Sequence, residues 1–110
     1  MRLETRTLLE DIRQAVEAIQ RFTKDKSLDD YLSDDQLQAS VERKFEIIGE
    51  ALNRLSYHDP DTVELIDDYA KIIAFRNTLI HGYSTIDNRI VWDIVLTHLP
   101  KLDADIRQLL

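Results

Sequence analysis

Residues 72–83 read Ile-Ile-Ala-Phe-Arg-Asn-Thr-Leu-Ile-His-Gly-Tyr, and both the fold and the chemistry of the chain depend on this stretch. Its four polar side chains of chemical interest are Arg76, Asn77, His81 and Tyr83. The apolar segment ends at Gly82, one of only two glycines in the 110-residue sequence. A guanidinium, an amide, an imidazole and a phenol among isoleucines need an explanation, and the surrounding pattern decides how they are interpreted.

The stretch is the second half of a predicted helix from about Thr62 to His81. At roughly 100° per residue, this helix carries two apolar stripes instead of one. The first stripe is Leu65, Ile72, Phe75 and Leu79, and the second, at heptad spacing, is Ile66, Ile73 and Ile80, with Tyr69 between the two. One stripe is enough to pack a helix into a small bundle. The second stripe therefore predicts a central helix that is buried on two sides or that also faces another subunit.

Helical periodicity extends over most of the remaining sequence. The predicted segments are residues 4–24, a short turn over 28–32, 34–55, 62–81 and 86–99, with a kink or a new helix at Pro100 and periodicity that continues to Leu109. Ser33 or Asp34 is the predicted N-cap of the second helix. We see no strand candidate and no internal repeat. The predicted fold class is all-α, an antiparallel bundle of four main helices, or of five if Pro100 starts a separate one.

The composition predicts a single helical domain over residues 1–110. No apolar run has the length of a membrane span, and the N-terminus lacks the apolar core of a signal peptide. Because the chain also has no cysteine, we expect a cytoplasmic protein. The net charge of −7 argues against extended binding to nucleic-acid backbones, which needs a basic surface. It leaves open a small, locally basic site that acts on a phosphodiester.

The predicted second helix has two unusual features. Gly49 lies in its interior, where glycine costs about 1 kcal/mol relative to alanine, so we expect another backbone to approach closely there. A separate stripe consists of Glu42, Glu46, Glu50 and Asn53. Carboxylates at this spacing could bind a metal or act in acid–base catalysis. Because the stripe has no histidine and Arg43 and Lys44 adjoin it, we favour a charged solvent face or an interface.

Arg76 and His81 are five residues apart, which places them roughly 140° apart around an ideal helix. One straight helix therefore does not direct both side chains at one substrate atom. If the second apolar stripe is a twofold interface, two copies of the helix would bring both pairs into one cleft. Loss of regular helix near Gly82 would bring His81 closer still.

Such a cleft would be competent for metal-independent RNA cleavage that leaves a cyclic phosphate. Arg76 can bind a phosphate through paired, charge-assisted hydrogen bonds. His81 can accept or donate a proton near neutral pH. No metal-ligand set in the sequence competes with this chemistry.

A structural role accounts for the same residues. A histidine in a last helical turn interacts favourably with the helix dipole, an arginine can extend from a helix flank into solvent, and Tyr83 can close the core. The spacing of Arg76 and His81 alone does not separate the two interpretations.

The wider sequence resembles the HepT-like family of the HEPN superfamily. Residues 76–83, Arg-Asn-Thr-Leu-Ile-His-Gly-Tyr, are similar to its Arg-x4-His-x-Tyr motif. Residues 40–51, which include Gly-Glu-Ala at positions 49–51, resemble its second-helix signature. Val91-Trp92-Asp93-Ile94 followed by Leu99-Pro100-Lys101-Leu102 resembles its C-terminal pattern. The resemblance covers almost the whole chain in the same order.

The resemblance implies a homodimeric helical bundle that acts as the ribonuclease toxin of a type VII toxin–antitoxin module. Arg76 and His81 would be the catalytic pair, with Asn77 as a supporting residue and tRNA or mRNA as the substrate. Tyr83 matches the tyrosine to which an MntA-like nucleotidyltransferase antitoxin adds AMP. ATP would be the substrate of that partner, and the chain itself would need no cofactor. Phosphate groups added two residues from His81 would bring negative charge to the RNA site.

One departure from the family pattern concerns the start of the third helix. Many members carry a Pro-Trp pair a few residues before the motif, whereas this chain has Asp67-Asp68-Tyr69. We therefore expect the start of this helix, and the depth of the cleft, to differ.

An alternative function belongs to a different class: a noncatalytic helical partner that helps a minimal nucleotidyltransferase bind its nucleotide or substrate. The net charge of −7 favours this alternative slightly, since a ribonuclease benefits from a basic approach surface.

Overall fold

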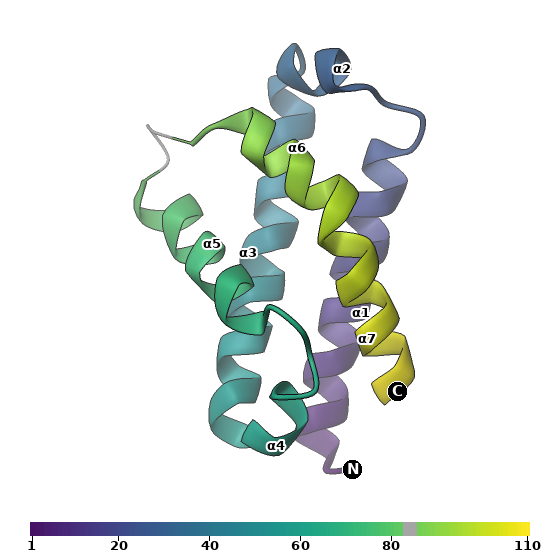
Figure 1. The fold of residues 1–110 in the computed structure, drawn as a ribbon, viewed down its shortest axis with the longest axis vertical. Helices are drawn as coiled ribbons and strands as arrows, with labels where there is room; N and C mark the ends of the chain where they lie inside the picture. The colour runs from purple at the N-terminus through teal and green to yellow at the C-terminus, as the bar shows by residue number, and fades with distance from the viewer. Residues whose placement is uncertain (83–85) are drawn as a thin grey trace.

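The computed structural model describes residues 1–82 and 86–110, which form seven helices and no strand (Figure 1). The helices are α1 Leu3–Thr23, α2 Leu28–Leu32, α3 Asp35–His58, α4 Pro60–Val63, α5 Tyr69–His81, α6 Asn88–Thr97 and α7 Leu99–Leu109. The four main segments are α1, α3, α5 and the pair α6–α7, and they run alternately in opposite directions (Figure 1). The predicted all-α antiparallel bundle is confirmed. None of the helices in the described ranges is long and apolar enough to cross a membrane.

The long helices α1 and α3 pack against each other and form the centre of the molecule. Their facing side chains, such as Ile12 on α1 and Ile48 and Leu52 on α3, are fully buried. α5 packs against α3, and α7 packs against α1. α2 closes one end against α6, where the rings of Tyr31 and Trp92 lie 5.2 Å apart. The candidate motif on α5 therefore lies beside the middle of the bundle.

Short polar side chains start several helices by accepting hydrogen bonds from backbone N–H groups that have no partner inside the helix. Asp34 accepts from the Leu37 N–H at 3.0 Å, which confirms one of the two predicted caps of α3. Pro100 lies in the first turn of α7, where proline is tolerated. The fourth predicted helix is therefore two helices, α6 and α7, as the proline allowed.

The predicted helix from Thr62 to His81 is wrong in its first half. α4 ends at Val63, and α5 begins only at Tyr69. Asp68, just before α5, has a left-handed backbone with φ of 63°. The N–H of Asp67 donates to Asp105 Oδ2 on α7 at 3.1 Å instead of to a carbonyl in its own helix. Asp105, 38 residues further along the chain, therefore stabilises this non-helical turn by accepting the Asp67 N–H.

This break also corrects the prediction of a second continuous apolar stripe. Ile66 lies before the break and is buried in the core of its own chain, whereas Leu65 beside it is 65% exposed. On α5, Ile73 is half-buried and Ile80 is 37% exposed. Ile66, Ile73 and Ile80 therefore do not form one continuous apolar surface, and Ile80 is the exposed residue of the three.

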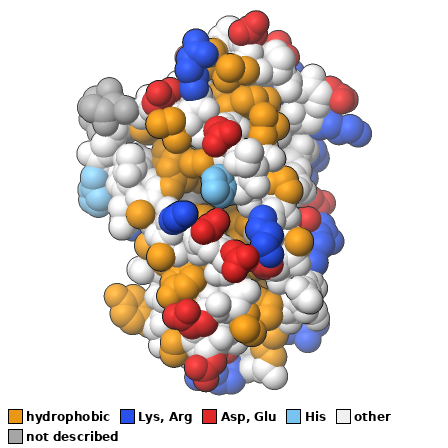
Figure 2. Space-filling view, viewed as in Figure 1, with side chains coloured by type: hydrophobic (Ala, Val, Ile, Leu, Met, Phe, Trp, Pro, Cys, Tyr) orange, Lys and Arg blue, Asp and Glu red, His pale blue; other side chains and the backbone are white. Residues whose placement is uncertain are grey.

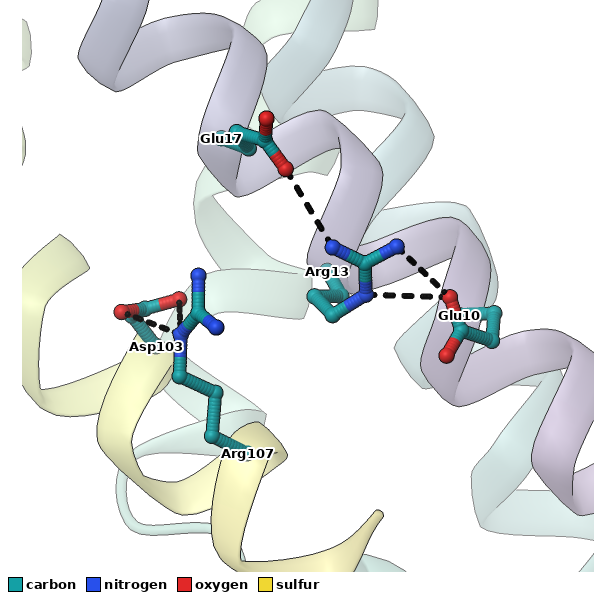
Figure 3. A network of polar contacts seen from close by, with 5 residues as sticks. All are labelled: Glu10, Arg13, Glu17, Asp103 and Arg107. Atoms are coloured by element: carbon teal, nitrogen blue, oxygen red, sulfur yellow. Dashed lines mark hydrogen bonds and ion pairs between the residues drawn. The ribbon is translucent and has the colours of Figure 1, made fainter.

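The outer surfaces of α1 and α7 carry ion pairs within single helices (Figure 3). Arg13 contacts both Glu10, at 2.9 Å, and Glu17, at 3.2 Å. Arg107 contacts Asp103 one turn before it at 3.0 Å. Exposed pairs of this kind contribute little to stability, typically about 0.3–0.5 kcal/mol, and they lie outside the candidate site.

Candidate functional site

Arg76 lies on the side of α5 that packs against α3. Its side chain is 24% exposed, and its terminal nitrogen Nη2 donates to Glu50 Oε2 at 2.7 Å. The other terminal nitrogen, Nη1, donates to Asn77 Oδ1 at 2.9 Å. The Nε atom is buried and has no hydrogen-bond partner within residues 1–82 and 86–110. Both terminal nitrogens of the guanidinium are therefore hydrogen-bonded, Nη2 to a residue of α3 and Nη1 to a residue of α5.

The close approach of α5 to α3 depends on Gly49. A Cβ atom at this position would lie 2.2 Å from Arg76 Cβ and 2.6 Å from Arg76 Cγ, well inside contact distance. The expected close approach at Gly49 occurs, but the atoms that approach belong to the side-chain stem of Arg76 and not to the backbone that was predicted. Because glycine has no Cβ, the stem of Arg76 can lie directly against α3 at this position.

The acidic stripe of α3 separates into three different environments. Glu42 is half-buried, and burial, followed by the charge of Glu46, raises the pKa of its carboxyl. Glu46 pairs with Arg43 at 3.3 Å, and Glu50 pairs with Arg76. In the part of the chain that the structure describes, no group of three or more histidine, cysteine or acidic residues could hold a metal ion. Our interpretation of the stripe as a charged solvent face or an interface did not include the contact of Glu50 with Arg76, because the two residues are distant in sequence.

A groove of about 380 Å³ lies where α1, α3 and α5 meet. Its charged lining residues are Asp11, Arg43, Glu46, Glu50, Arg54 and Arg76, with Leu8, Ile47, Ala51 and Ile80 as the apolar part. The lining thus holds three guanidiniums and three carboxylates. The groove is thus locally more basic than a chain with a net charge of −7 would suggest, but it has no excess of positive charge.

His81 is the last residue of α5 and is exposed. The helix stays regular up to this residue, since the N–H of Gly82 still donates to the Thr78 carbonyl at 2.8 Å. The predicted unwinding near Gly82, which would have moved His81 toward Arg76, does not occur before His81. The two side chains therefore keep their helical separation of roughly 140°.

The structure thus brings Asn77 to Arg76 and leaves His81 on another side of the same helix. Tyr83, the predicted modification site, lies outside the described residues. The predicted catalytic pair does not converge within one chain.

A second groove separates α5 from α6. Its apolar lining residues are Ile72, Phe75, Ile90 and Ile94, and its polar ones are Asp68, Lys71, Asp93 and His98. Figure 2 shows apolar side chains gathered on the face of the molecule that carries α5 and α6. Ile90 is 57% exposed there. α5 therefore has a packed side against α3 and a partly open apolar side toward α6.

The family model described as "Ribonuclease HepT-like" matches residues 12–109, which include α3, the whole of α5 and the arginine–histidine motif. The chain belongs to the HepT-like family. The resemblance inferred from the motif, the second helix and the C-terminal pattern is therefore confirmed.

Curated relatives agree with this assignment to the HepT-like family. A protein of Thermococcus cleftensis named "Probable ribonuclease HepT" is 32% identical over 109 residues, covering 99% of this chain and 98% of its own length. A Methanocaldococcus jannaschii protein named "Gamma-glutamylcyclotransferase and putative RNase" is also 32% identical, over the whole chain. This chain spans only 49% of that relative. No solved structure matches the chain significantly.

Proposed function

We propose that this HepT-like chain is a metal-independent endoribonuclease whose site is completed by a second copy of the chain. The observation that carries the proposal is the seating of Arg76: a guanidinium anchored beside an open groove, in a protein of a ribonuclease family. His81 lies on the same helix but faces elsewhere. A twofold partner would bring His81 of one chain toward Arg76 of the other.

In this site, Arg76 binds the scissile phosphate and stabilises the charge on the pentacoordinate phosphorus. One histidine accepts the proton of the ribose 2′-hydroxyl as its oxygen attacks the phosphorus. The bond from phosphorus to the 5′-oxygen breaks, and the second histidine protonates the leaving oxygen. The products are a 2′,3′-cyclic phosphate and a 5′-hydroxyl. The RNA would be a tRNA or an mRNA.

We further propose that the chain is the toxin of a type VII toxin–antitoxin module in the cytoplasm. The antitoxin would be an MntA-like nucleotidyltransferase that transfers AMP from ATP to the hydroxyl of Tyr83. The added phosphate would carry negative charge to a position two residues from His81, where it would repel RNA. The intact mass of the chain, purified with and without this partner, tests the modification. An AMP-sized increment at Tyr83 is expected, and an unmodified but inhibited toxin would contradict it.

The nuclease is tested with protein purified without its partner, on total RNA with a chelator present. Arg76→Ala and His81→Ala are expected to abolish cleavage and toxicity while the chain still folds as a dimer. His58→Ala is the matched control, because His58 is also an exposed histidine in a last helical turn. Wild-type activity in His81→Ala would contradict the proposal.

A noncatalytic alternative is favoured by one observation. The groove beside Arg76 carries as many carboxylates as guanidiniums, which is a poor approach surface for RNA. The chain would then hold nucleotide or substrate for a minimal nucleotidyltransferase. It would show no RNA cleavage alone, and the nucleotidyltransferase would bind its nucleotide more tightly when the chain is present.

A further inference from the structure

Glu50 is the contact that links the acidic stripe of α3 to the candidate arginine. Its carboxylate lies 2.7 Å from Arg76 Nη2 and stays 48% exposed, so water and solutes still reach it. Gly49, one residue earlier, lies against the stem of the same arginine. Two consecutive residues of α3 therefore determine where Arg76 sits and how its guanidinium is turned.

The donors of Arg76 show why Glu50 need not compete with a phosphate. A guanidinium has five N–H groups: one on Nε and two on each terminal nitrogen. The contacts with Glu50 and Asn77 use one N–H on each terminal nitrogen. A second N–H on each terminal nitrogen is not used by these contacts, and it can still donate a charge-assisted hydrogen bond to a phosphate oxygen in the groove. Glu50 and a phosphate can therefore bind Arg76 together.

The orientation of the guanidinium is not fixed at its buried Nε atom. This atom has no hydrogen-bond partner in the described ranges, so it does not itself resist rotation of the guanidinium plane. The contacts at the two terminal nitrogens supply that resistance. Of these, the Glu50 contact is charged and comes from a different helix, and charge-assisted hydrogen bonds are the stronger kind.

We propose that Glu50 is the positioning residue for Arg76: it orients the guanidinium from α3 so that its free donors meet the scissile phosphate. This inference rests on the proposed ribonuclease function, and it adds to that function a residue that does not touch the substrate. Without Glu50, the positive charge of Arg76 stays in the groove, but its guanidinium is no longer held in one orientation.

The test compares Glu50→Ala and Glu50→Gln with the control Glu17→Gln. Glu17 also pairs with an arginine, Arg13 at 3.2 Å, but it lies on α1 outside the groove of Arg76. Misplaced catalytic groups can cost about 100-fold in rate, so we expect Glu50→Ala to lower kcat by about 10–100-fold with a smaller change in KM. Glu50→Gln keeps an acceptor oxygen and should retain more activity than the alanine variant. Glu17→Gln should behave as wild type.

A readout independent of activity is the side-chain Nε–H signal of Arg76 in a ¹⁵N–¹H spectrum, assigned by its loss in Arg76→Lys. It should be visible near neutral pH in wild type and in Glu17→Gln, and lost through solvent exchange in Glu50→Ala. If wild type cuts no RNA but the signal changes as expected, the positioning is right and the proposed function is wrong. Unchanged or increased kcat in Glu50→Ala, or an unchanged signal, would overturn the positioning role.

Discussion

Gly49 on α3 and Arg76 on α5 lie so close that the space a Cβ would need at Gly49 is taken by the Arg76 stem, 2.2 Å from the ideal Cβ position. The residue with the smallest side chain and the candidate catalytic residue are therefore one structural unit.

Gly49→Ala should separate α3 from α5. Overpacking a close contact costs about 1–3 kcal/mol, and alanine returns about 1 kcal/mol through its better helix propensity. Because 2.2 Å is far too close for any Cβ, the cost falls at the upper end of this range. We expect a net loss of about 1–2 kcal/mol in the free energy of unfolding, measured by denaturant titration.

The double variant Gly49→Ala/Arg76→Gly is the control for this contact, since it moves the missing Cβ to the other helix. It should be more stable than the sum of the two single changes, because contacting sites are not additive. Simple additivity would show that the 2.2 Å approach does not limit stability.

Asp105→Ala should destabilise the turn between α4 and α5. Asp105 is 7% exposed, and it accepts both the Asp67 N–H at 3.1 Å and Lys101 Nζ at 2.7 Å. Hydrogen bonds to a charged group contribute about 1.5–3 kcal/mol, so we expect the free energy of unfolding to fall by about 1–3 kcal/mol. Asp103→Ala is the matched control, since Asp103 lies on the same helix and contacts only Arg107 among the ion pairs of the described residues. Its effect should stay within about 0.5 kcal/mol.

The contact between Lys101 and Asp105 predicts that stability depends on pH in the alkaline range. The hydrogen bond to Asp105, more than any other cause, raises the pKa of Lys101 above its ordinary value of 10.5. A raised lysine pKa means that its contribution is complete below the unfolded value and lost as the pH rises through the folded one. The stability difference between wild type and Lys101→Met should therefore shrink above about pH 10.5. A constant difference would show that Lys101 acts through packing alone.

Asp59 should make stability depend on acid. Its carboxyl accepts hydrogen bonds from the hydroxyls of Thr62 at 2.7 Å and Thr5 at 2.9 Å, and it caps α4. These bonds, that from Thr62 first, lower the pKa of Asp59 below its ordinary value of 3.8. The stabilisation is therefore present above that value and lost as the pH falls through the lower, folded pKa. The difference in denaturation midpoint between wild type and Asp59→Asn should shrink below about pH 4.

Asp35→Asn is the control for this acid dependence, because no hydrogen bond of its carboxylate is resolved among the described residues and its charge is likewise near a helix start. The difference in denaturation midpoint between wild type and Asp35→Asn should change much less over the same pH range. Equal pH profiles for the two variants would assign the effect to net charge and not to the cap.

Ile80→Asp should weaken self-association. Ile80 is the exposed apolar residue beside His81 on α5, and it also lines the groove of Arg76. A carboxylate buried in an interface without a partner is costly, so the proposed dimer should shift toward monomer in sedimentation velocity runs at micromolar concentration. Leu65→Asp, at a residue that is 65% exposed but lies before the break, should leave the dimer intact. An unchanged dimer in Ile80→Asp would place the interface elsewhere.

Much of the fold was predictable because helical periodicity is a local property. The bounds of α1 and α3 followed from apolar spacing, the cap at Asp34 from residue chemistry, and the close approach at Gly49 from the cost of glycine inside a helix. The order of Arg76, Asn77 and His81 on one helix also followed from the chain alone. These features depend on residues within a few turns of each other.

Two features of the site were decided only by the tertiary structure. At the break before α5, the N–H of Asp67 donates to Asp105, which lies on α7 and is 38 residues further along the chain. No apolar pattern near residue 67 predicts that contact. The pairing of Glu50 with Arg76 spans 26 residues and depends on how α3 and α5 cross. The sequence by itself determined which side chains were available and on which helices they lie. Packing decided which of them meet, because hydrogen bonds and charges act over a few ångströms of space whatever the separation along the chain.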